Sequence, residues 1–155
     1  MRQIQANLGK PSDSFSIAIV VSLFNRDITQ ALQDGAIQRL IDCGISTDEI
    51  TLVEVPGAVE IPLVASRLAK SKQYQVIIAL GAVVRGETTH YDYVCEQVSH
   101  GCQRVALECD MPVIFGVLTT ENESQAWDRL GGKHGHKGCD AADAALAMYR
   151  VLQSI

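Results

Sequence analysis

The segment GAVVRGETTHYDYVC, residues 81–95, contains residue types that could bind an anion and move a proton. An apolar run stops at Arg85, Gly86 follows, and two threonines and His90 come just before a helical pattern. Gly86 would relieve the steric limits of a sharp strand-to-helix turn. The free amides at the start of the helix, together with the threonine hydroxyls, would attract a phosphate. The alternative is that Thr88 merely caps the helix.

His90 falls in the first turn of that helix. The positive end of a helix dipole disfavours the imidazolium, so a neutral ring that can accept a proton is favoured there. A general base or proton shuttle is one interpretation of His90, and a structural histidine is the other.

Three other regions offer candidate side chains. Phe24, at the end of the first apolar run, could stack on a flat heterocycle or lie in the core. Glu60, after a Gly-Ala turn, could accept hydrogen bonds from sugar-type hydroxyls or serve only as a helix-start carboxylate. Arg129 and Lys137 are candidate partners of a phosphate or carbonyl group, or else solvated charges.

Other familiar sites are not predicted. The spacing of His134, His136 and Cys139 matches no zinc pattern, so we expect no metal, and the role of this cluster stays open. Neither GxGxxG nor GxxxxGK[ST] occurs, so dinucleotide and P-loop binding lack their phosphate cradle. The five cysteines form no CxxC motif, and we expect small buried hydrophobic side chains in a reducing cytosol.

These candidates need a scaffold that gathers the ends of several apolar runs. Continuous apolar strands that alternate with amphipathic helices indicate a parallel sheet covered on both faces, in which ligands bind beyond the carboxyl ends of the strands. We predict strands at 15–24, 50–55, 74–84 and 111–120, and helices at about 25–44, 58–71, 89–110, 120–130 and 140–153.

Local signals predict where some helices begin and end. Asn25 or Asp27 could cap the first helix, and Gly44 could end it. Thr120 with Glu123 has the spacing of a capping box. Residues 131–138, GGKHGHKG, are predicted to form a glycine-rich loop.

Composition narrows the class of protein. The 155 residues, 47% of them hydrophobic and 20% charged, suit one domain at 14–155, preceded by a polar arm at 1–13. The net charge is −5 and no basic stripe stands out, so we expect no nucleic-acid partner. The N-terminus lacks a secretory apolar segment, and no apolar run is long enough to span a bilayer. We therefore expect a cytoplasmic protein with no membrane contact.

Several motifs, taken in order, resemble the lumazine synthase family. They are FN, VPGAVEIP, GAVVRGETTHYDYV, PVIFGVLTTEN and GGKHGHKG, and they extend over nearly the whole chain. The resemblance implies a flavodoxin-like doubly wound fold and a reaction without a redox or metal cofactor. In that reaction 5-amino-6-(D-ribitylamino)uracil condenses with 3,4-dihydroxy-2-butanone 4-phosphate. The product is 6,7-dimethyl-8-ribityllumazine, a precursor of riboflavin, and phosphate and water are released.

The resemblance also implies which residues hold the pyrimidine substrate. Phe24 would stack on the ring, and Asn25 would reach the ribityl chain. Residues that hold the ribityl hydroxyls, partly through backbone amides, would be Ala58, Val59 and Glu60. Residues that line the pyrimidine, largely by backbone, would be Ala82, Val83 and Val84. Ala82 stands where many members have threonine, so a hydroxyl contact is lost there.

For the second substrate, the resemblance assigns the phosphate to the amides and hydroxyl of Glu87 and Thr88 and to the guanidinium of Arg129. His90 would transfer protons. Lys137 would contact the pyrimidine carbonyl, and Phe115 would close the pocket.

The family forms homopentamers, which many members assemble into an icosahedral shell of sixty subunits. The pocket would lie between adjacent subunits, with Phe115, Arg129 and Lys137 contributed by the neighbour. The N-terminal arm would add a strand to the next subunit's sheet, and riboflavin synthase is a further candidate partner. The alternatives are a non-catalytic flavin or lumazine binding protein, a receiver-type signalling domain and a purely structural shell subunit. A binding protein of this kind would have the same fold, but binding alone gives no reason for a neutral His90.

Overall fold

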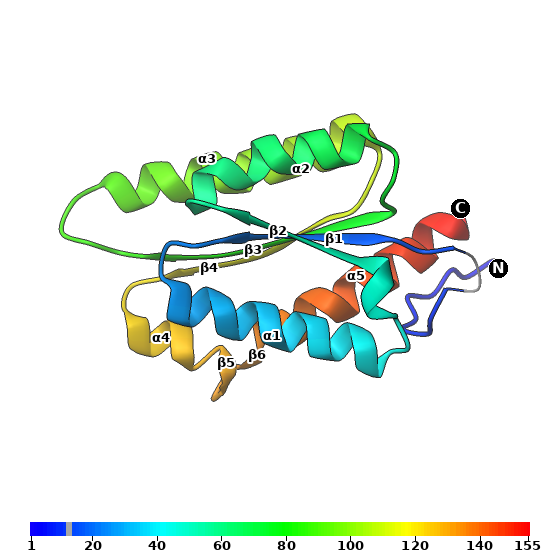
Figure 1. Cartoon of the computed structure of the whole chain (residues 1–155), viewed down its shortest axis with the longest axis horizontal. Coiled ribbons are helices and arrows are strands. Elements are labelled where there is room, and N and C mark those ends of the chain that lie inside the picture. Colours follow the sequence, from blue (N-terminus) through cyan, green and yellow to red (C-terminus); the bar gives the residue numbers. More distant parts are fainter. Residues whose placement is uncertain (12–13) are drawn as a thin grey trace.

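The computed structural model describes residues 1–11 and 14–155, in which a four-stranded sheet lies between two layers of helices (Figure 1). The order of elements is β1 (Ile17–Ser22), α1 (Arg26–Asp42), β2 (Ile50–Val55), α2 (Ile61–Lys70), β3 (Val76–Val84), α3 (His90–Cys109), β4 (Val113–Thr120), α4 (Glu123–Trp127), β5 (Leu130–Gly132), β6 (Gly135–His136) and α5 (Lys137–Gln153).

The main sheet has the strand order β2-β1-β3-β4, and all of its pairs are parallel. The two central strands are the most apolar ones: every residue of β1, and every residue of β3 except Val84, is buried. Strands that are covered on both faces have no solvent side, so their sequences are continuously apolar rather than alternating. The prediction of a doubly wound, four-stranded parallel sheet is confirmed.

Successive residues of β1 belong to the two different cores. Ile17, Ile19 and Val21 pack with α1 and α5, whereas Ala18 and Val20 pack with α2 and α3. This alternation follows from the pleat, because neighbouring side chains of a strand point to opposite faces. Figure 1 shows α2 and α3 together on one side of the sheet, and α1, α4 and α5 on the other.

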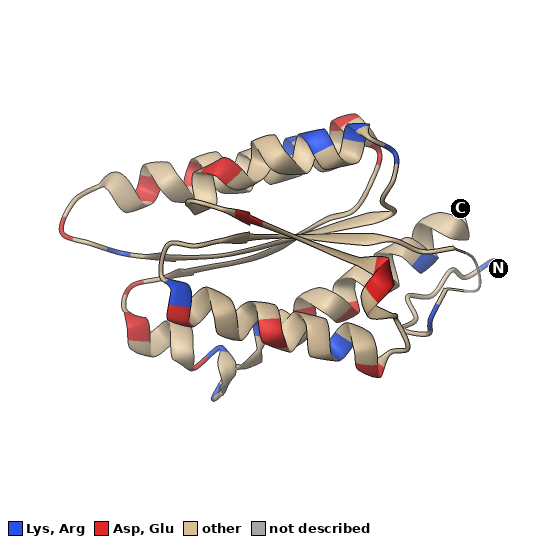
Figure 2. Cartoon of the chain, viewed as in Figure 1, with Lys and Arg blue, Asp and Glu red and all other residues tan. Residues whose placement is uncertain are grey.

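Charge is kept away from the central strands (Figure 2). Lysine, arginine, aspartate and glutamate lie mainly on the helices and the connecting segments. The exception is Glu54 on the edge strand β2, where its Oε1 is 2.8 Å from Nη2 of Arg26. Among the helices that the structure describes, none combines the length and the apolar character needed to cross a bilayer.

Several details of the predicted elements differ from the structure. Asn25 is the N-cap residue of α1, as predicted, but it is in a left-handed conformation (φ 58°) and its side chain donates to the Ala82 carbonyl instead of capping the helix. Asn122 rather than Thr120 caps α4 by accepting a hydrogen bond from the Gln125 amide, and the Thr120 hydroxyl donates to the Asn122 carbonyl. The helix predicted at 58–71 is split into a 3₁₀ turn, Ala58–Glu60, and α2. The predicted 131–138 loop contains the antiparallel pair β5 and β6, because glycines with positive φ at 131 and 135 allow the chain to fold back.

Of the N-terminal arm, residues 12–13 and the boundary after them lie outside the described residues. Residues 1–10 are exposed and form no strand. The arm runs beside the end of α5, where the Arg150 guanidinium donates to the carbonyl groups of Gly9 and Lys10, and Arg2 donates to the Ser154 carbonyl. Pairing of the arm with a neighbouring sheet stays a prediction.

Candidate functional site

A pocket of about 320 Å³ opens beyond the carboxyl ends of β1 and β3, beside the turn that follows β2. The chain leaves β1 toward β2 on one side, whereas β3 lies on the other side, so the order of the sheet reverses between β1 and β3. A crevice forms at such a point because the two connections diverge, and ligands of doubly wound sheets bind there. The pocket therefore lies where the sequence predicted a site.

The β1–α1 connection supplies Phe24 and Asn25. Phe24 lies beyond the end of the strand and its side chain is 71% exposed, so it does not belong to the core and its ring is free to stack on a ligand. Asn25 donates Nδ2 to the Ala82 carbonyl at 3.0 Å. That bond fixes the connection to β3 and leaves the Asn25 Oδ1 as the acceptor available at the pocket.

The turn after β2 forms a second wall. Ala58 and Val59 line the pocket, whereas Glu60 stands outside its lining. A Cβ added to Gly57 would come within 2.9 Å of Oε2 of Glu60, so the carboxylate folds back over Gly57 at the rim. Glu60 is thus an exposed acceptor beside the pocket.

The floor comes from the end of β3. Ala82, Val83 and Val84 line the pocket, and Ala82 and Val83 are buried. Gly86 also lines it, although the predicted reason for a glycine is wrong: its φ is not positive, and a Cβ there would meet nothing within 4 Å in this chain. The glycine instead leaves open space at the mouth of the pocket.

Thr88, just before α3, and His90, its first residue, line the pocket, whereas Glu87 is not part of its lining. The Thr88 hydroxyl accepts a hydrogen bond from the His90 amide at 3.3 Å, whereas Thr89, the N-cap residue of α3, makes no side-chain cap. A hydroxyl is also a donor, so Thr88 can hold this amide and still bind an anion. His90 is exposed and faces the same space as Phe24.

Four lining residues were not predicted to bind substrate, namely Gly57, Gly86, Tyr91 and Val94. Tyr91 and Val94 lie in the first turns of α3, directly after the end of a buried strand, and that position is the signal that could have found them. Burial, together with a hydrogen bond to Cys95, raises the pKa of the Tyr91 phenol, which keeps that group protonated at neutral pH.

A second group of predicted residues lies apart from this pocket. Phe115 on the edge strand β4 and Lys137 at the start of α5 line a separate hollow of about 250 Å³. Phe115 is 44% exposed, and the Lys137 ammonium is 3.0 Å from Asp140 Oδ2. Arg129 follows α4, and its Nη1 donates to the Gln125 carbonyl at 2.8 Å. Within one chain, the predicted site is therefore divided into two halves.

The cluster of His134, His136 and Cys139 does not form a metal centre. The His136 Nδ1 accepts hydrogen bonds from the amides of Gly138 and Cys139, so its ring caps α5. Across residues 1–11 and 14–155, no three histidine, cysteine or acidic side chains gather as metal ligands do. All five cysteines are free, and burial raises the pKa of Cys102 to about 11.

Comparison with known proteins shows the family of this chain. Residues 14–153 match the family model described as 6,7-dimethyl-8-ribityllumazine synthase. The chain belongs to that family. Proteins named 6,7-dimethyl-8-ribityllumazine synthase from three strains of Coxiella burnetii are 58% identical to it over 142 residues, which cover 92% of this chain and 94% of each relative. The predicted family is confirmed, and with it a lumazine-forming transferase of riboflavin biosynthesis.

Proposed function

We propose that this chain condenses 5-amino-6-(D-ribitylamino)uracil with 3,4-dihydroxy-2-butanone 4-phosphate in the pocket between β1 and β3. The observation that carries the proposal is the composition of that pocket: an exposed ring, Phe24, faces a histidine and a helix start across apolar strand ends. A flat pyrimidine suits the ring and the apolar floor, and a phosphate suits the amides and hydroxyl near Thr88.

In this proposal the pyrimidine stacks on Phe24 over Ala82, Val83 and Val84. Asn25, Ala58, Val59 and Glu60 surround the ribityl chain, whose hydroxyls find acceptors at the Asn25 Oδ1 and the Glu60 carboxylate. Glu60 lies at the rim, so it reaches the end of the chain rather than the ring.

The butanone phosphate would bind on the connection between β3 and α3, through Glu87 and Thr88. The amine of the pyrimidine attacks the ketone, and loss of water gives an imine. Phosphate then leaves, and ring closure with loss of a second water completes the lumazine. His90 would carry the protons between these steps. No metal or redox cofactor is part of the proposed chemistry.

The other half of the site would come from a neighbouring subunit. Phe115, Arg129 and Lys137 do not line the pocket of their own chain, yet an arginine and a lysine are the residue types that suit a phosphate and a carbonyl. An arginine fork from the neighbour would hold the phosphate, Lys137 would contact the pyrimidine carbonyl, and Phe115 would cover the ring. Large exposed apolar side chains, such as Leu63, Leu107 and Trp127, favour association of the subunits.

We further propose a homopentamer, with a sixty-subunit shell as its larger assembly and riboflavin synthase as a candidate partner. The arm at the N-terminus would add a strand to the open edge of β2 in the next subunit. Five free cysteines suit a reducing cytoplasm.

Mixed oligomers test the composite site directly. His90→Ala and Arg129→Ala subunits are each impaired, but a mixed ring contains sites in which an intact pocket meets an intact arginine. We expect random co-assembly at equal amounts to restore about a quarter of the wild-type lumazine fluorescence signal, since half of the pockets and half of the arginines are intact. Activity of the mixture equal to the mean of the two separate variants would contradict a site shared between subunits.

A further inference from the structure

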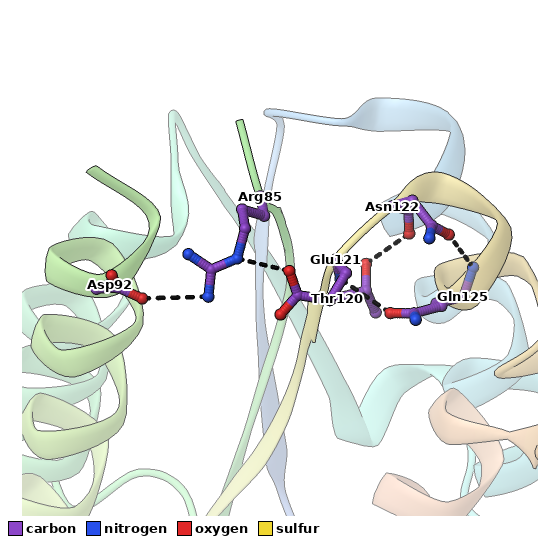
Figure 3. Close-up of polar contacts among 6 residues, drawn as sticks. All are labelled: Arg85, Asp92, Thr120, Glu121, Asn122 and Gln125. Carbon is purple, nitrogen blue, oxygen red and sulfur yellow. Dashed lines mark hydrogen bonds and ion pairs between the residues drawn. The ribbon is translucent and has the colours of Figure 1, made fainter. Parts of the chain in front are cut away.

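Arg85 is the residue of the opening motif that the proposed site leaves without a role. It follows β3 directly and lies outside the lining of the pocket. Its guanidinium is engaged within its own chain (Figure 3): Nε donates to Glu121 Oε2 at 2.6 Å, and Nη2 donates to Asp92 Oδ1 at 3.3 Å. The guanidinium carbon also lies 4.2 Å from the centre of the Tyr91 ring.

These contacts join three elements that meet at the pocket. Arg85 continues from β3, its amide donates to the Thr120 carbonyl at the end of β4, and Asp92 and Tyr91 belong to the first turn of α3. The connection at 86–89 therefore begins at Arg85 and ends on a helix that the same side chain holds. Tyr91 lines the pocket beside His90, so the stacked guanidinium supports the wall from behind.

The residue that accepts from Arg85 Nε, Glu121, directly follows β4, and its backbone is held in place. The Glu121 amide donates to the side chain of Gln125 at 2.9 Å, and the Gln125 amide donates to Asn122 Oδ1 at 2.9 Å (Figure 3). The Gln125 carbonyl in turn accepts the Nη1 of Arg129. Arg85 is thus paired with a residue whose backbone is hydrogen-bonded to α4.

We propose that Arg85 is a positioning residue for lumazine formation: its planar fork, divided between Asp92 and Glu121 and stacked on Tyr91, holds the 86–89 connection and His90 in place. This inference rests on the proposed function of that pocket. Only a guanidinium can bridge two carboxylates and stack at the same time, whereas a lysine ammonium acts as a single point charge. Exposed ion pairs stabilise a fold little, so the effect should fall on the geometry of the site.

The competing role is direct binding of the substrate phosphate by Arg85. The two roles predict opposite results when the carboxylates are neutralised. If Arg85 positions the site, the double variant Asp92→Asn with Glu121→Gln loosens it and lowers kcat. If Arg85 binds phosphate, the same variant removes competing acceptors and lowers the KM for butanone phosphate.

The experiment compares Arg85→Lys, the double variant and the triple variant, with the spontaneous reaction subtracted. We expect Arg85→Lys and the double variant each to lower kcat about 10- to 100-fold, as a misplacement of about 1 Å can, with native mass and melting temperature unchanged. The triple variant should lose no more than either, because the side chains act as one unit. Arg104→Ala breaks the exposed Arg104–Glu108 pair on α3, the helix that also carries Asp92. This variant is the matched control and should keep the wild-type kcat.

Unchanged kcat in Arg85→Lys, additive losses in the triple variant, or a lower KM for butanone phosphate in the double variant would each overturn the positioning role. If Arg85→Lys does not assemble, Glu121→Gln alone, which removes one acceptor charge, decides in the same way. A wild-type protein that forms no lumazine above the spontaneous rate would refute the proposed function itself. That result is distinguishable from failure of the positioning role, which is measured on the variants.

Discussion

At the scale of single residues, most of the groups that line the pocket are suited to binding, whereas His90 is suited to carrying protons. Most of its surface is ring, aliphatic side chain and backbone, and His90 is the titratable imidazole among them. A site of this kind gains most of its rate by holding two substrates in reacting geometry, which is worth up to about 7–11 kcal/mol. Proton transfer adds roughly 10²–10⁴-fold.

His90→Ala should therefore slow lumazine formation by roughly 10²-fold without abolishing it, since Phe24 and the phosphate site still align the substrates. The measurement is single-turnover lumazine fluorescence at saturating substrates, with the uncatalysed rate subtracted. His100→Ala, on the exposed part of α3, is the control for the loss of a histidine from that helix. Turnover that vanishes completely in a folded His90→Ala protein would show that proximity supplies far less than expected.

At the scale of elements, the sequence predicted the centres of the strands and helices better than their ends. Continuous apolar runs such as 76–84 are buried on both faces. Their composition predicts them well because apolar composition reflects burial. Ends depend on individual hydrogen bonds that composition does not reveal. Asn25 bonds to β3 instead of capping α1, and the 131–138 segment pairs with itself as β5 and β6.

The helix α1 contains Gly35, and only the three-dimensional structure explains why a glycine is needed there. A Cβ on Gly35 would overlap the imidazole of His136, and that ring is held by hydrogen bonds to the amides of Gly138 and Cys139. Glycine in a helix normally costs about 1 kcal/mol relative to alanine. Here the overlap reverses the sign, because overpacking costs about 1–3 kcal/mol.

We therefore expect Gly35→Ala to lower the free energy of unfolding and the melting temperature, whereas Gly86→Ala, whose Cβ meets nothing within 4 Å, should leave both unchanged. Urea titration followed by circular dichroism measures the difference. Adding His136→Asn to Gly35→Ala should restore part of the loss, since asparagine is smaller and still caps a helix. A more stable Gly35→Ala protein would mean that the ring of His136 can move aside at no cost.

At the scale of the whole molecule, the predicted site residues lie in two separate places on one chain. The motifs extend over the whole chain and so include both groups, but their spacing could not show that the groups lie apart. Phe115, Arg129 and Lys137 lie on β4, after α4 and at the start of α5, whereas Phe24 and His90 face the β1–β3 crevice. In the proposed composite site, the surfaces that meet depend on a second copy of the chain, and the sequence of one copy does not contain that geometry.

If the two halves meet only between subunits, activity should follow assembly rather than folding. Graded urea should first dissociate the oligomer, because protein interfaces of standard size bury less surface than a folded core such as the one around β1, which is fully buried. We expect lumazine formation to disappear together with the native mass, while far-ultraviolet circular dichroism still reports folded chains. Raising the protein concentration should move the loss of activity to higher urea and leave the unfolding of the isolated subunit in place. Folded monomers that retain full activity would place a complete site within one chain.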